Sequence, residues 1–542
     1  MASITTNLRY DRQIRLWGEE GQASIQNTNV CVLGSRALAT ETLKNLVLPG
    51  INSFHIIDDA NVDVTDLGHN FFLTQNDIGE PRAKVITKYL NELNPNVTGS
   101  YTICSPTKIT LLPDLIKFSI VIATNLTTAE ILPISTYLYE NGVPFINTRI
   151  CGLFGYCRLS FKHHAIYNCQ AEHAAPDMRL DRPFAALLEM EAANDLTKMS
   201  HQDHAHTPYL LLIMKALNQW RNVKGDPTAF PTSYQQRKEI VNILMDMRMP
   251  NDKGTLDEEN FDEAKAAIPR VLVETTIPPT VKDVFAHEYC KIENLTEKTA
   301  TSFWVLATAL KLFVERHDAL PLSGQLPDMT SDSERYTKLI NLYRAKASQD
   351  AKEVYQNALL IMKGIFDEGD EIITFQQCQQ FCKHAAFINV QNGTSLVDET
   401  NFTGILSQIT EPQLAEPPRS VHPLTWLALI KAVDNFYDGK RRFPGTNGVP
   451  RSIDAEDLCH RLEHLVMKTE DQNLLQKLKA IIPKEAIEEI CRYGAAEPHV
   501  IASIIGGIVS QEAIKLVTHQ YVPVDNTFIY DGHTQASASI RM

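Results

Sequence analysis

The stretch that decides the fold lies near the start of the chain and reads NVCVLGSRALATETLKNLVLPG, residues 29–50. Its first part, 29–34, is a short apolar run rich in β-branched residues that ends in glycine. Residues 37–48 then repeat apolar side chains at helical spacing, until Pro49 and Gly50 stop the helix. The pattern predicts a buried strand, a tight turn and a helix.

The same alternation continues along the next hundred or so residues. Residues 53–58 (SFHIID) predict a second strand, 83–93 a second amphipathic helix, and 118–124 (FSIVIAT) a further strand. Strand-like runs follow at 144–147 and 155–162. Strands that alternate with helices predict a parallel sheet covered by those helices.

The middle of the chain has a different character from its two ends. From about residue 170 to 485 the pattern is mainly helical, whereas a helix at 496–517 and a strand at 527–531 follow it. A lone strand at the far end needs a sheet to join. We therefore predict an α/β, Rossmann-like domain built from both chain ends, residues 1–169 and 486–542, with a helical insertion at 170–485.

Composition narrows the class of protein. The chain has 542 residues, of which 44% are apolar, so it is expected to fold into several globular domains. Its net charge is −14 and its Lys and Arg residues are dispersed, which argues against nucleic acid as a partner. The stretch 499–517 carries Glu512 and Lys515, so we expect a buried helix and no membrane association.

The ten cysteines have scattered spacings, and the start of the chain has no charged segment followed by an apolar run. These features predict a reduced intracellular protein, located in the cytoplasm, the nucleus or both.

The turn after the first strand suggests a nucleotide-binding fold. A turn that cradles phosphates uses glycines for tight backbone angles and for close approach to the phosphates. Here the turn is GSRALA, residues 34–39, and only Gly34 is present. Arg36, Ala37 and Ala39 fill the later positions, where we expect their side chains to occupy the phosphate space. The sequence predicts a nucleotide fold with a blocked cradle.

Several longer sequence motifs resemble those of a known family. The segments YDRQIRLWG (10–18) and ETLKNLVLPG (41–50) resemble the opening of ubiquitin-activating enzymes and their bacterial ThiF/MoeB-like relatives. Four further words resemble the regulatory, non-catalytic subunits of the neddylation branch: HNFFL (69–73), MRLDRPF (178–184), DHAHTP (203–208) and RYGAAEPH (492–499). The resemblance implies a degenerate ThiF/MoeB-type adenylation domain, in which the insertion is the counterpart of the catalytic cysteine domain.

The resemblance also implies that the nucleotide site has lost its ligands. Active family members carry two acids separated by one residue, an Asn-Arg-Gln triplet, a Lys and a metal-binding Asp. Asp58 matches the first acid, but Ala60 stands at the second, and Gly-His-Asn around His69 replaces the triplet. Arg82 replaces the Lys and Asn125 the metal-binding Asp. The resemblance therefore implies that this chain binds no cofactor, while the partner subunit binds ATP and magnesium.

No catalytic residue is expected within the chain itself. It lacks a Cys followed by the short Thr- and Pro-rich loop of active members, and it lacks the two Cys-x-x-Cys pairs that hold zinc in them. Cys378 and Cys382 are predicted to be buried on one helix. His201, His204 and His206 precede a helix, and we expect this segment to cap the start of that helix and not to bind a metal.

Two sets of residues are candidates for contacts with partners. In family relatives an Arg in the Tyr-x-Arg-Gln word reaches ATP bound by the opposite subunit, which implies this role for Arg12, with Arg15 as the second candidate. The amphipathic segment at 328–344 is a candidate partner contact by resemblance, with packing inside its own domain as the equal alternative. Its candidate side chains are Tyr336, Leu339, Ile340 and Tyr343.

The predicted function is that of a regulatory subunit in a heterodimer. The resemblance implies partnership with a catalytic subunit, with a ubiquitin-like modifier and, through the complex, with a conjugating enzyme. The complex would adenylate the C-terminus of the modifier and form a thioester on the catalytic subunit. The alternatives are an independent adenylyltransferase or dinucleotide oxidoreductase, an adaptor that uses a degenerate nucleotide-binding fold, and the supporting subunit of sumoylation, whose insertion is shorter.

Overall fold

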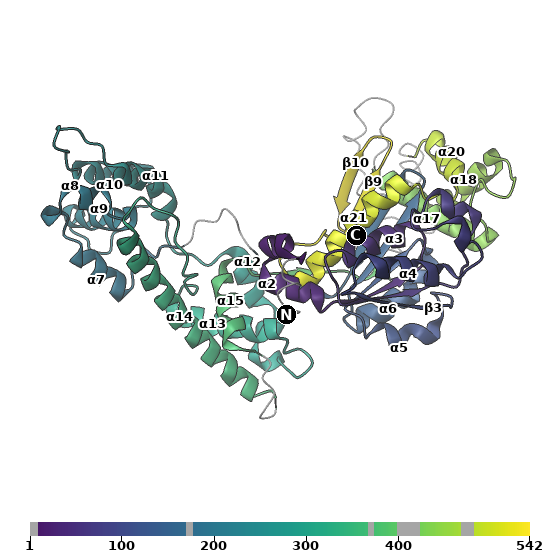
Figure 1. Ribbon diagram of the computed structural model, residues 1–542, viewed down its shortest axis with the longest axis horizontal. Helices are drawn as coiled ribbons and strands as arrows, with labels where there is room; N and C mark the ends of the chain where they lie inside the picture. The colour runs from purple at the N-terminus through teal and green to yellow at the C-terminus, as the bar shows by residue number, and fades with distance from the viewer. Residues whose placement is uncertain (1–8, 168, 170–176, 367–372, 398–422, 468–481) are drawn as a thin grey trace. The chain divides into compact units, whose positions relative to one another are not determined.

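The chain divides into two compact units, each described here by itself (Figure 1). The first unit comprises Met1–His164 and Gln391–Met542, and the second comprises Ala165–Val390. The computed structural model describes residues 9–167, 169, 177–366, 373–397, 423–467 and 482–542.

An eight-stranded sheet forms the centre of the first unit, in the order β10-β9-β6-β5-β4-β1-β2-β3. Neighbouring strands are parallel from β3 across to β5 and antiparallel from β5 to β10. This confirms the predicted parallel, Rossmann-like sheet and its completion by the C-terminal strand. The strands are β1 Asn29–Leu33, β2 Ser53–Ile57, β3 Thr98–Thr102, β4 Ile120–Thr124, β5 Phe145–Cys151, β6 Phe154–Ser160, β9 Thr527–Asp531 and β10 Ala536–Ile540.

Strand β1 is apolar throughout because helices cover both faces of the sheet. Val30 and Val32 pack into a core that also contains residues of α3, α4 and α21. Cys31 and Leu33 point to the opposite face, into a core shared with α5 and α6. Successive side chains of a strand alternate between faces, so burial on both faces selects a continuous apolar run.

Helices from both ends of the sequence cover the sheet of the first unit (Figure 1). Helix α21 lies against α3, and a Cβ on Gly506 would lie 2.9 Å from the Cβ of Glu41 and 3.0 Å from the backbone N of Thr42. Only glycine permits this approach. The helices are α2 Asp11–Gln26, α3 Ala37–Val47, α4 Arg82–Leu93, α5 Leu112–Leu115, α6 Thr128–Glu140, α17 Pro423–Lys440, α18 Arg451–Met467, α20 Lys484–Tyr493 and α21 His499–Thr518.

Helix α21 is, among the described residues, the single helix whose length and composition would suffice to cross a membrane. Its most apolar 18-residue window has a mean hydropathy of 1.6, and 56% of that window is buried inside the structure. It packs on α3, on α2 and on strands β5 and β6, as expected of a core helix.

The helices after residue 422 belong to the first unit, so the insertion ends at residue 390 and not at 485. Trp426 of α17 stacks on Phe154 of β6 with ring centroids 3.6 Å apart. Its Nε1 donates a hydrogen bond of 3.1 Å to Asp531 at the end of β9. Helical periodicity showed that α17 has apolar faces, but it could not show that they pack on the distant sheet. The boundary predicted at 169/170 is observed at 164/165.

The second unit is mainly helical, as predicted. Its long helix α14 spans 31 residues and joins two cores. Leu339 and Tyr343 in its first half pack with α9 and α11, whereas Val354 and Ala358 pack with α13 and α15. The helices are α7 Ala185–Ala193, α8 His201–Ala205, α9 Tyr209–Lys224, α10 Tyr234–Asp246, α11 Glu259–Val271, α12 Pro279–Ala286, α13 Ser302–His317, α14 Ser333–Lys363 and α15 Phe375–Lys383. Strands β7 His163–Ile166 and β8 Asn389–Asn392 pair where the chain passes between the units.

For two of the four candidate side chains on α14, the structure shows the alternative of packing inside their own domain. Leu339 and Tyr343 are fully buried in the second unit, and the Tyr343 hydroxyl donates a 2.7 Å hydrogen bond to the carbonyl of Met178. These two side chains pack within their own domain because α9 and α11 cover them. Tyr336 and Ile340 are half-buried, and the Tyr336 hydroxyl donates to the carbonyl of Pro327 at 3.4 Å.

We predict that Tyr343→Phe lowers the free energy of unfolding by about 1 kcal/mol, because the carbonyl of Met178 loses its buried donor. Thermal denaturation of the full chain measures this change. Tyr234→Phe, at a tyrosine that is 80% exposed on the same unit, is the matched control and should leave the transition unchanged. Equal transitions for both variants would show that the Tyr343 hydroxyl contributes no net stability.

Candidate functional site

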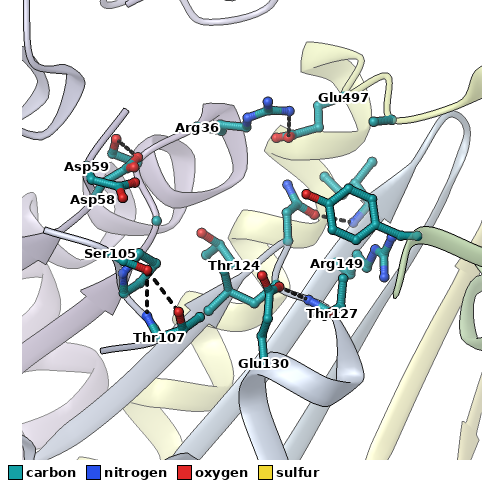
Figure 2. Close-up of a pocket in the computed structure, with 18 of the residues that line it drawn as sticks. Arg36, Asp58, Asp59, Ser105, Thr107, Thr124, Thr127, Glu130, Arg149 and Glu497 are labelled. Atoms are coloured by element: carbon teal, nitrogen blue, oxygen red, sulfur yellow. Dashed lines mark hydrogen bonds and ion pairs between the residues drawn. The ribbon is translucent and has the colours of Figure 1, made fainter. Parts of the chain in front are cut away.

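A pocket of about 300 Å³ opens at the carboxyl ends of β1, β2 and β4 (Figure 2). In open α/β sheets ligands bind at this edge, where the order of the strands reverses. Here the reversal lies between β1 and β4. The lining includes Gly34, Ser35 and Arg36 after β1, Asp58 and Asp59 after β2, Thr124 at the end of β4, Asn125 and Thr127 after it, and Arg82, Arg149, Tyr437, Phe443 and Glu497 from other segments.

The glycine of the first turn is required by the backbone. Gly34 has φ +95°, and a Cβ there would lie 2.7 Å from the Oγ1 of Thr124. That hydroxyl donates a 3.0 Å hydrogen bond to the carbonyl of Leu33 at the end of β1. The turn therefore keeps the close approach between β1 and β4 that a nucleotide-binding fold uses.

A buried arginine occupies the side of the pocket formed by β2 and α4. Arg82 is 6% exposed, and its Nη2 donates to Asp58 at 2.9 Å. Its Nη1 donates to Asp66 at 3.1 Å, and its Nε to the hydroxyl of Ser35 at 3.1 Å. Charged hydrogen bonds use each nitrogen of the guanidinium, so little of its donor capacity is left for a ligand.

Both carboxylate oxygens of Asp58 likewise accept hydrogen bonds from within the chain. Ser35 donates its hydroxyl hydrogen bond to the same Oδ2 that Arg82 contacts, and the backbone N of Ala60 donates to Oδ1 at 3.0 Å. Burial by itself raises the pKa of Asp58, but Arg82, Ser35 and the Ala60 amide outweigh it and hold the pKa below its usual range. The same ion pairs raise the pKa of Arg82 in spite of its burial.

Two further arginines of the pocket are paired with carboxylates from the second half of the sequence. Arg149 forms a buried ion pair with Asp434 of α17. Asp434 also accepts hydrogen bonds from the backbone N and the hydroxyl of Thr128, at 3.0 and 2.7 Å, at the start of α6. Arg36 pairs with Glu497 at 3.2 Å, as Figure 2 shows. Each arginine that lines the described pocket therefore has an internal counter-ion.

ATP with magnesium does not fit the residues that are present. Phosphates require unpaired cations or free amide donors, and Mg²⁺ requires carboxylate oxygens. The lining arginines are neutralised, and Asp58 is bound to Arg82. Asn125, which the sequence resemblance matched to the metal-binding acid, uses its Oδ1 to accept a 2.8 Å hydrogen bond from the backbone N of Ile150.

The structure corrects part of the prediction that Arg36, Ala37 and Ala39 fill the phosphate space. Ala37 and Ala39 of α3 are 1% and 0% exposed and pack in the core. Their methyl groups therefore do not enter the pocket, contrary to the prediction. Arg36 does line it. His69 and Ala60 contribute no side chain to the lining, although the Ala60 amide binds Asp58. The helix begins with apolar residues because α3 must bury this face against the sheet.

Arg12 and Arg15 lie on α2, outside the pocket, and both are exposed. Arg15 forms an exposed ion pair of 3.0 Å with Asp11, one helical turn away. Arg12 makes no ion pair with any residue that the structure describes.

Sequence reasoning missed Ser35, Asp66, Arg149, Asp434 and Glu497. The signal for Glu497 was its place in the word at 492–499, but no local pattern connects it with Arg36, 461 residues earlier. Pairings of this range depend on the tertiary fold.

The histidines near α8 point to different partners. His204 binds the buried carboxylate of Glu258, and the Nδ1 of His206 binds the backbone carbonyl of Gln202 at 2.7 Å. His201 lies 3.3 Å from Asp257. Within the described ranges, no three His, Cys, Asp or Glu side chains are placed to hold a metal.

The ten cysteines are free thiols. Seven of them are buried and three are half-buried, and Cys378 and Cys382 are buried on α15 as predicted. Burial raises the pKa of Cys151 to about 11 and of Cys491 to about 12, so their thiols are protonated at neutral pH.

Comparison with known proteins agrees with the fold. The model of the ThiF family matches residues 10–542, so the chain belongs to the ThiF family. Two similar proteins are each named NEDD8-activating enzyme E1 regulatory subunit. That of Caenorhabditis elegans is 45% identical over 100% of both chains, and that of Danio rerio is 38% identical over 98% of both. Within the ThiF family, the chain is therefore a member of the family that these regulatory subunits form.

One solved structure with a likeness to part of the chain is that of E. coli MccB with AMPCPP and selenomethionine MccA. It is 21% identical, with a TM-score of 0.26, and the match covers 30% of this chain and 52% of that one.

We predict that Arg82→Met lowers the free energy of unfolding by about 3 kcal/mol at neutral pH, because Asp58 and Asp66 stay buried without their cation. The pKa of Asp58 is lower in the folded chain than its ordinary value, so folding favours the ionised form. This stabilisation is complete above about pH 4 and is lost as the pH falls towards the folded pKa. The difference between wild type and variant should therefore shrink below about pH 4.

Urea denaturation of both proteins between pH 7 and pH 3 measures this difference. Lys84→Met, on the same helix as Arg82, removes an exposed ion pair with Glu80 and is the matched control, with a change below about 1 kcal/mol. A difference between wild type and Arg82→Met that stays constant down to pH 3 would contradict the assignment of the shift to this ion pair.

Proposed function

We propose that this chain is the supporting subunit of a heterodimeric activating enzyme for a ubiquitin-like modifier. The complex adenylates the C-terminus of the modifier with ATP and then forms a thioester on the catalytic subunit. The observation that carries the proposal is the pocket in which Arg36, Arg82 and Arg149 are each neutralised by a carboxylate of the same chain. Relatives named as regulatory subunits support it.

The partner subunit supplies the nucleotide chemistry in this proposal. Adenylation needs cations and donors aimed at the charge that develops on the phosphate. The corresponding groups of this chain are engaged with each other, which opposes an independent adenylyltransferase. We therefore infer that ATP and magnesium bind to the catalytic subunit, and that a conjugating enzyme meets this chain through the complex. Free thiols throughout the chain favour action in the cytoplasm, the nucleus or both.

We expect the isolated chain to give no saturable binding signal with ATP and magnesium at millimolar concentrations in titration calorimetry. The reason is that a phosphate would have to displace Asp434 or Asp58 from a buried arginine, or the buried Glu497 from Arg36. The purified heterodimer under the same conditions is the positive control. A dissociation constant in the micromolar range for the isolated chain would contradict the proposal that its nucleotide site is degenerate.

None of the ten cysteines of this chain should carry the modifier as a thioester. Burial disfavours the thiolate at Cys151 and Cys491 and also raises the pKa of Cys169 and Cys290. At Cys290 the effect of burial outweighs the hydrogen bond from Thr308 and the charge of Lys311, which lower the pKa. The complex is incubated with modifier and ATP, and adducts that reductant cleaves are mapped by mass spectrometry. An adduct on this chain and not on the catalytic subunit would reverse the proposed roles.

Arg12 is the residue of this chain that we propose to act at the partner's ATP. It is exposed on α2 and lacks a counter-ion among the described residues, in contrast to Arg15, which is paired with Asp11. A guanidinium is always charged and offers forked donors that suit phosphate oxygens. A solvent-facing guanidinium on α2 that pairs with no described residue is available for this contact.

Arg12→Ala should leave assembly of the heterodimer intact and slow adenylation of the modifier about tenfold to a thousandfold, as loss of one transition-state donor does. Pyrophosphate exchange by the purified heterodimer measures the rate. Arg451→Ala, at an exposed arginine that begins α18, is the matched control and should not change it. If Arg12→Ala exchanges pyrophosphate as fast as wild type, Arg12 is only a surface residue, and Arg15→Ala then tests the second candidate.

A further inference from the structure

The part of α2 that carries Arg12 is too short to hold its own shape. Gly18, with φ +73° and ψ +172°, interrupts the helix, so its first part consists only of residues 11–17. A helix of about two turns is marginal by itself in water, because few backbone hydrogen bonds offset the cost of ordering it. The direction in which Arg12 points must therefore be fixed by contacts at the two ends of this part.

Tyr10 anchors the start of this part in the first unit. It is 1% exposed, and its hydroxyl accepts hydrogen bonds from the Nδ2 of Asn94 at 3.0 Å and of Asn96 at 3.4 Å, just after α4. Asn94 is fixed in turn, because it is fully buried and its Nδ2 also donates to the carbonyl of Val47 at 2.8 Å. The backbone N of Ile14 donates to the carbonyl of Tyr10 at 2.8 Å, which connects the anchor to the first turn of α2.

The chain around Tyr10 is built to admit its side chain. Gly50, after α3, has φ +89°, and a Cβ there would lie 2.6 Å from the Cζ of Tyr10, so only glycine leaves room for the ring. The preceding residue is also tied down, since the Nη2 of Arg9 donates to the carbonyl of Leu93 at 3.0 Å. Two consecutive residues before α2 are thus bound to the end of α4.

Gln520 fixes the other end of this part of α2. Trp17 is 8% exposed and packs in the core of the first unit, and its carbonyl accepts a hydrogen bond from the Nε2 of Gln520. Gln520 follows α21 and is 3% exposed. Gly21 makes room for its amide, because a Cβ there would lie 2.6 Å from the same Nε2. Residues 11–17 are therefore held at both ends by buried hydrogen bonds.

Between the two anchors, side chains of α2 face solvent. Arg12 and Arg15 are exposed, and Leu16 is 53% exposed. Arg15 is engaged with Asp11, whereas Arg12 pairs with no described residue. A charged donor on a fixed backbone loses less conformational freedom when it binds a phosphate than one on a mobile segment does. The two anchors thus hold the backbone of Arg12 in place and leave its guanidinium accessible.

We propose that Tyr10 is a positioning residue for Arg12: its buried side chain fixes the first turn of α2, so that the guanidinium is presented in one direction to a phosphate held by another chain. This rests on the proposed function, in which Arg12 acts at the ATP of the catalytic subunit. An arginine on a loose segment would spend less time in the productive geometry, and a misplacement of about 1 Å is enough to slow a reaction by up to about a hundredfold. Tyr10 touches no substrate and acts only through Arg12.

The test is pyrophosphate exchange by the purified heterodimer. Tyr10→Phe removes one hydrogen-bond acceptor and should slow exchange about threefold to tenfold, whereas Tyr10→Ala removes the buried ring and should slow it about tenfold to a hundredfold. Gln520→Ala releases the other end of residues 11–17 and should act like Tyr10→Phe. Tyr156→Phe is the matched control with an unchanged rate, because it loses the same kind of hydrogen bond, from the Nδ2 of buried Asn147 at 2.9 Å, within the sheet and away from α2.

A combined variant distinguishes positioning from a merely structural role. If Tyr10 acts through Arg12, Tyr10→Ala should cause no further slowing when Arg12→Ala is already present, because no guanidinium is left to position. Effects of the two substitutions that multiply in the double variant would overturn the positioning role. Size-exclusion chromatography establishes that each variant assembles with the catalytic subunit. Tyr10→Phe, which keeps the ring, takes the place of Tyr10→Ala in the double variant if the alanine prevents folding.

The outcomes also separate this inference from the proposed function. Slow exchange by Arg12→Ala, together with wild-type rates for both Tyr10 variants, would overturn the positioning role and leave the proposed function standing. A wild-type rate for Arg12→Ala would overturn the role of Arg12 and this inference with it, while the chain remains a supporting subunit. A wild-type heterodimer that exchanges no pyrophosphate would overturn both.

Discussion

The buried ion pairs of Arg82 are the interaction on which the pocket depends. The guanidinium begins α4 and joins Asp58 after β2, Asp66 in the following turn and Ser35 in the first turn of the fold. Removing such a charge from water is costly unless every donor is satisfied, and here the chain satisfies it. Four segments that could position a nucleotide are instead bound to one another.

Carboxylates from the second half of the sequence neutralise the other two arginines of the pocket in the same way. Glu497 neutralises Arg36, and Asp434 neutralises Arg149 while it also caps the start of α6 through Thr128. Acidic side chains thus stand where an anionic ligand would stand in a binding site, and they tie the later helices to the early strands. The electrostatic energy that an active site directs to its ligand contributes here to the stability of the fold.

The local sequence pattern was sufficient to predict the helices and strands. It was insufficient to predict what each of them packs against. The run at 29–34 and the helical spacing after it predicted β1, α3 and the parallel sheet, because these depend on residues that lie near each other in sequence. The end of the insertion at 390, the burial of Tyr343 and the burial of Ala37 could not be predicted in this way. Periodicity shows that a face is apolar, but only the tertiary fold decides whether a domain, a pocket or a partner covers it.

The measurement that tests the central claim most directly is the number of nucleotides bound by the assembled enzyme. Native mass spectrometry of the heterodimer of this chain and its catalytic subunit, at saturating ATP with magnesium, counts them. One nucleotide for each heterodimer is the result that internally paired arginines predict. Two nucleotides, with the second lost when the lining of this chain's pocket is altered, would contradict the account.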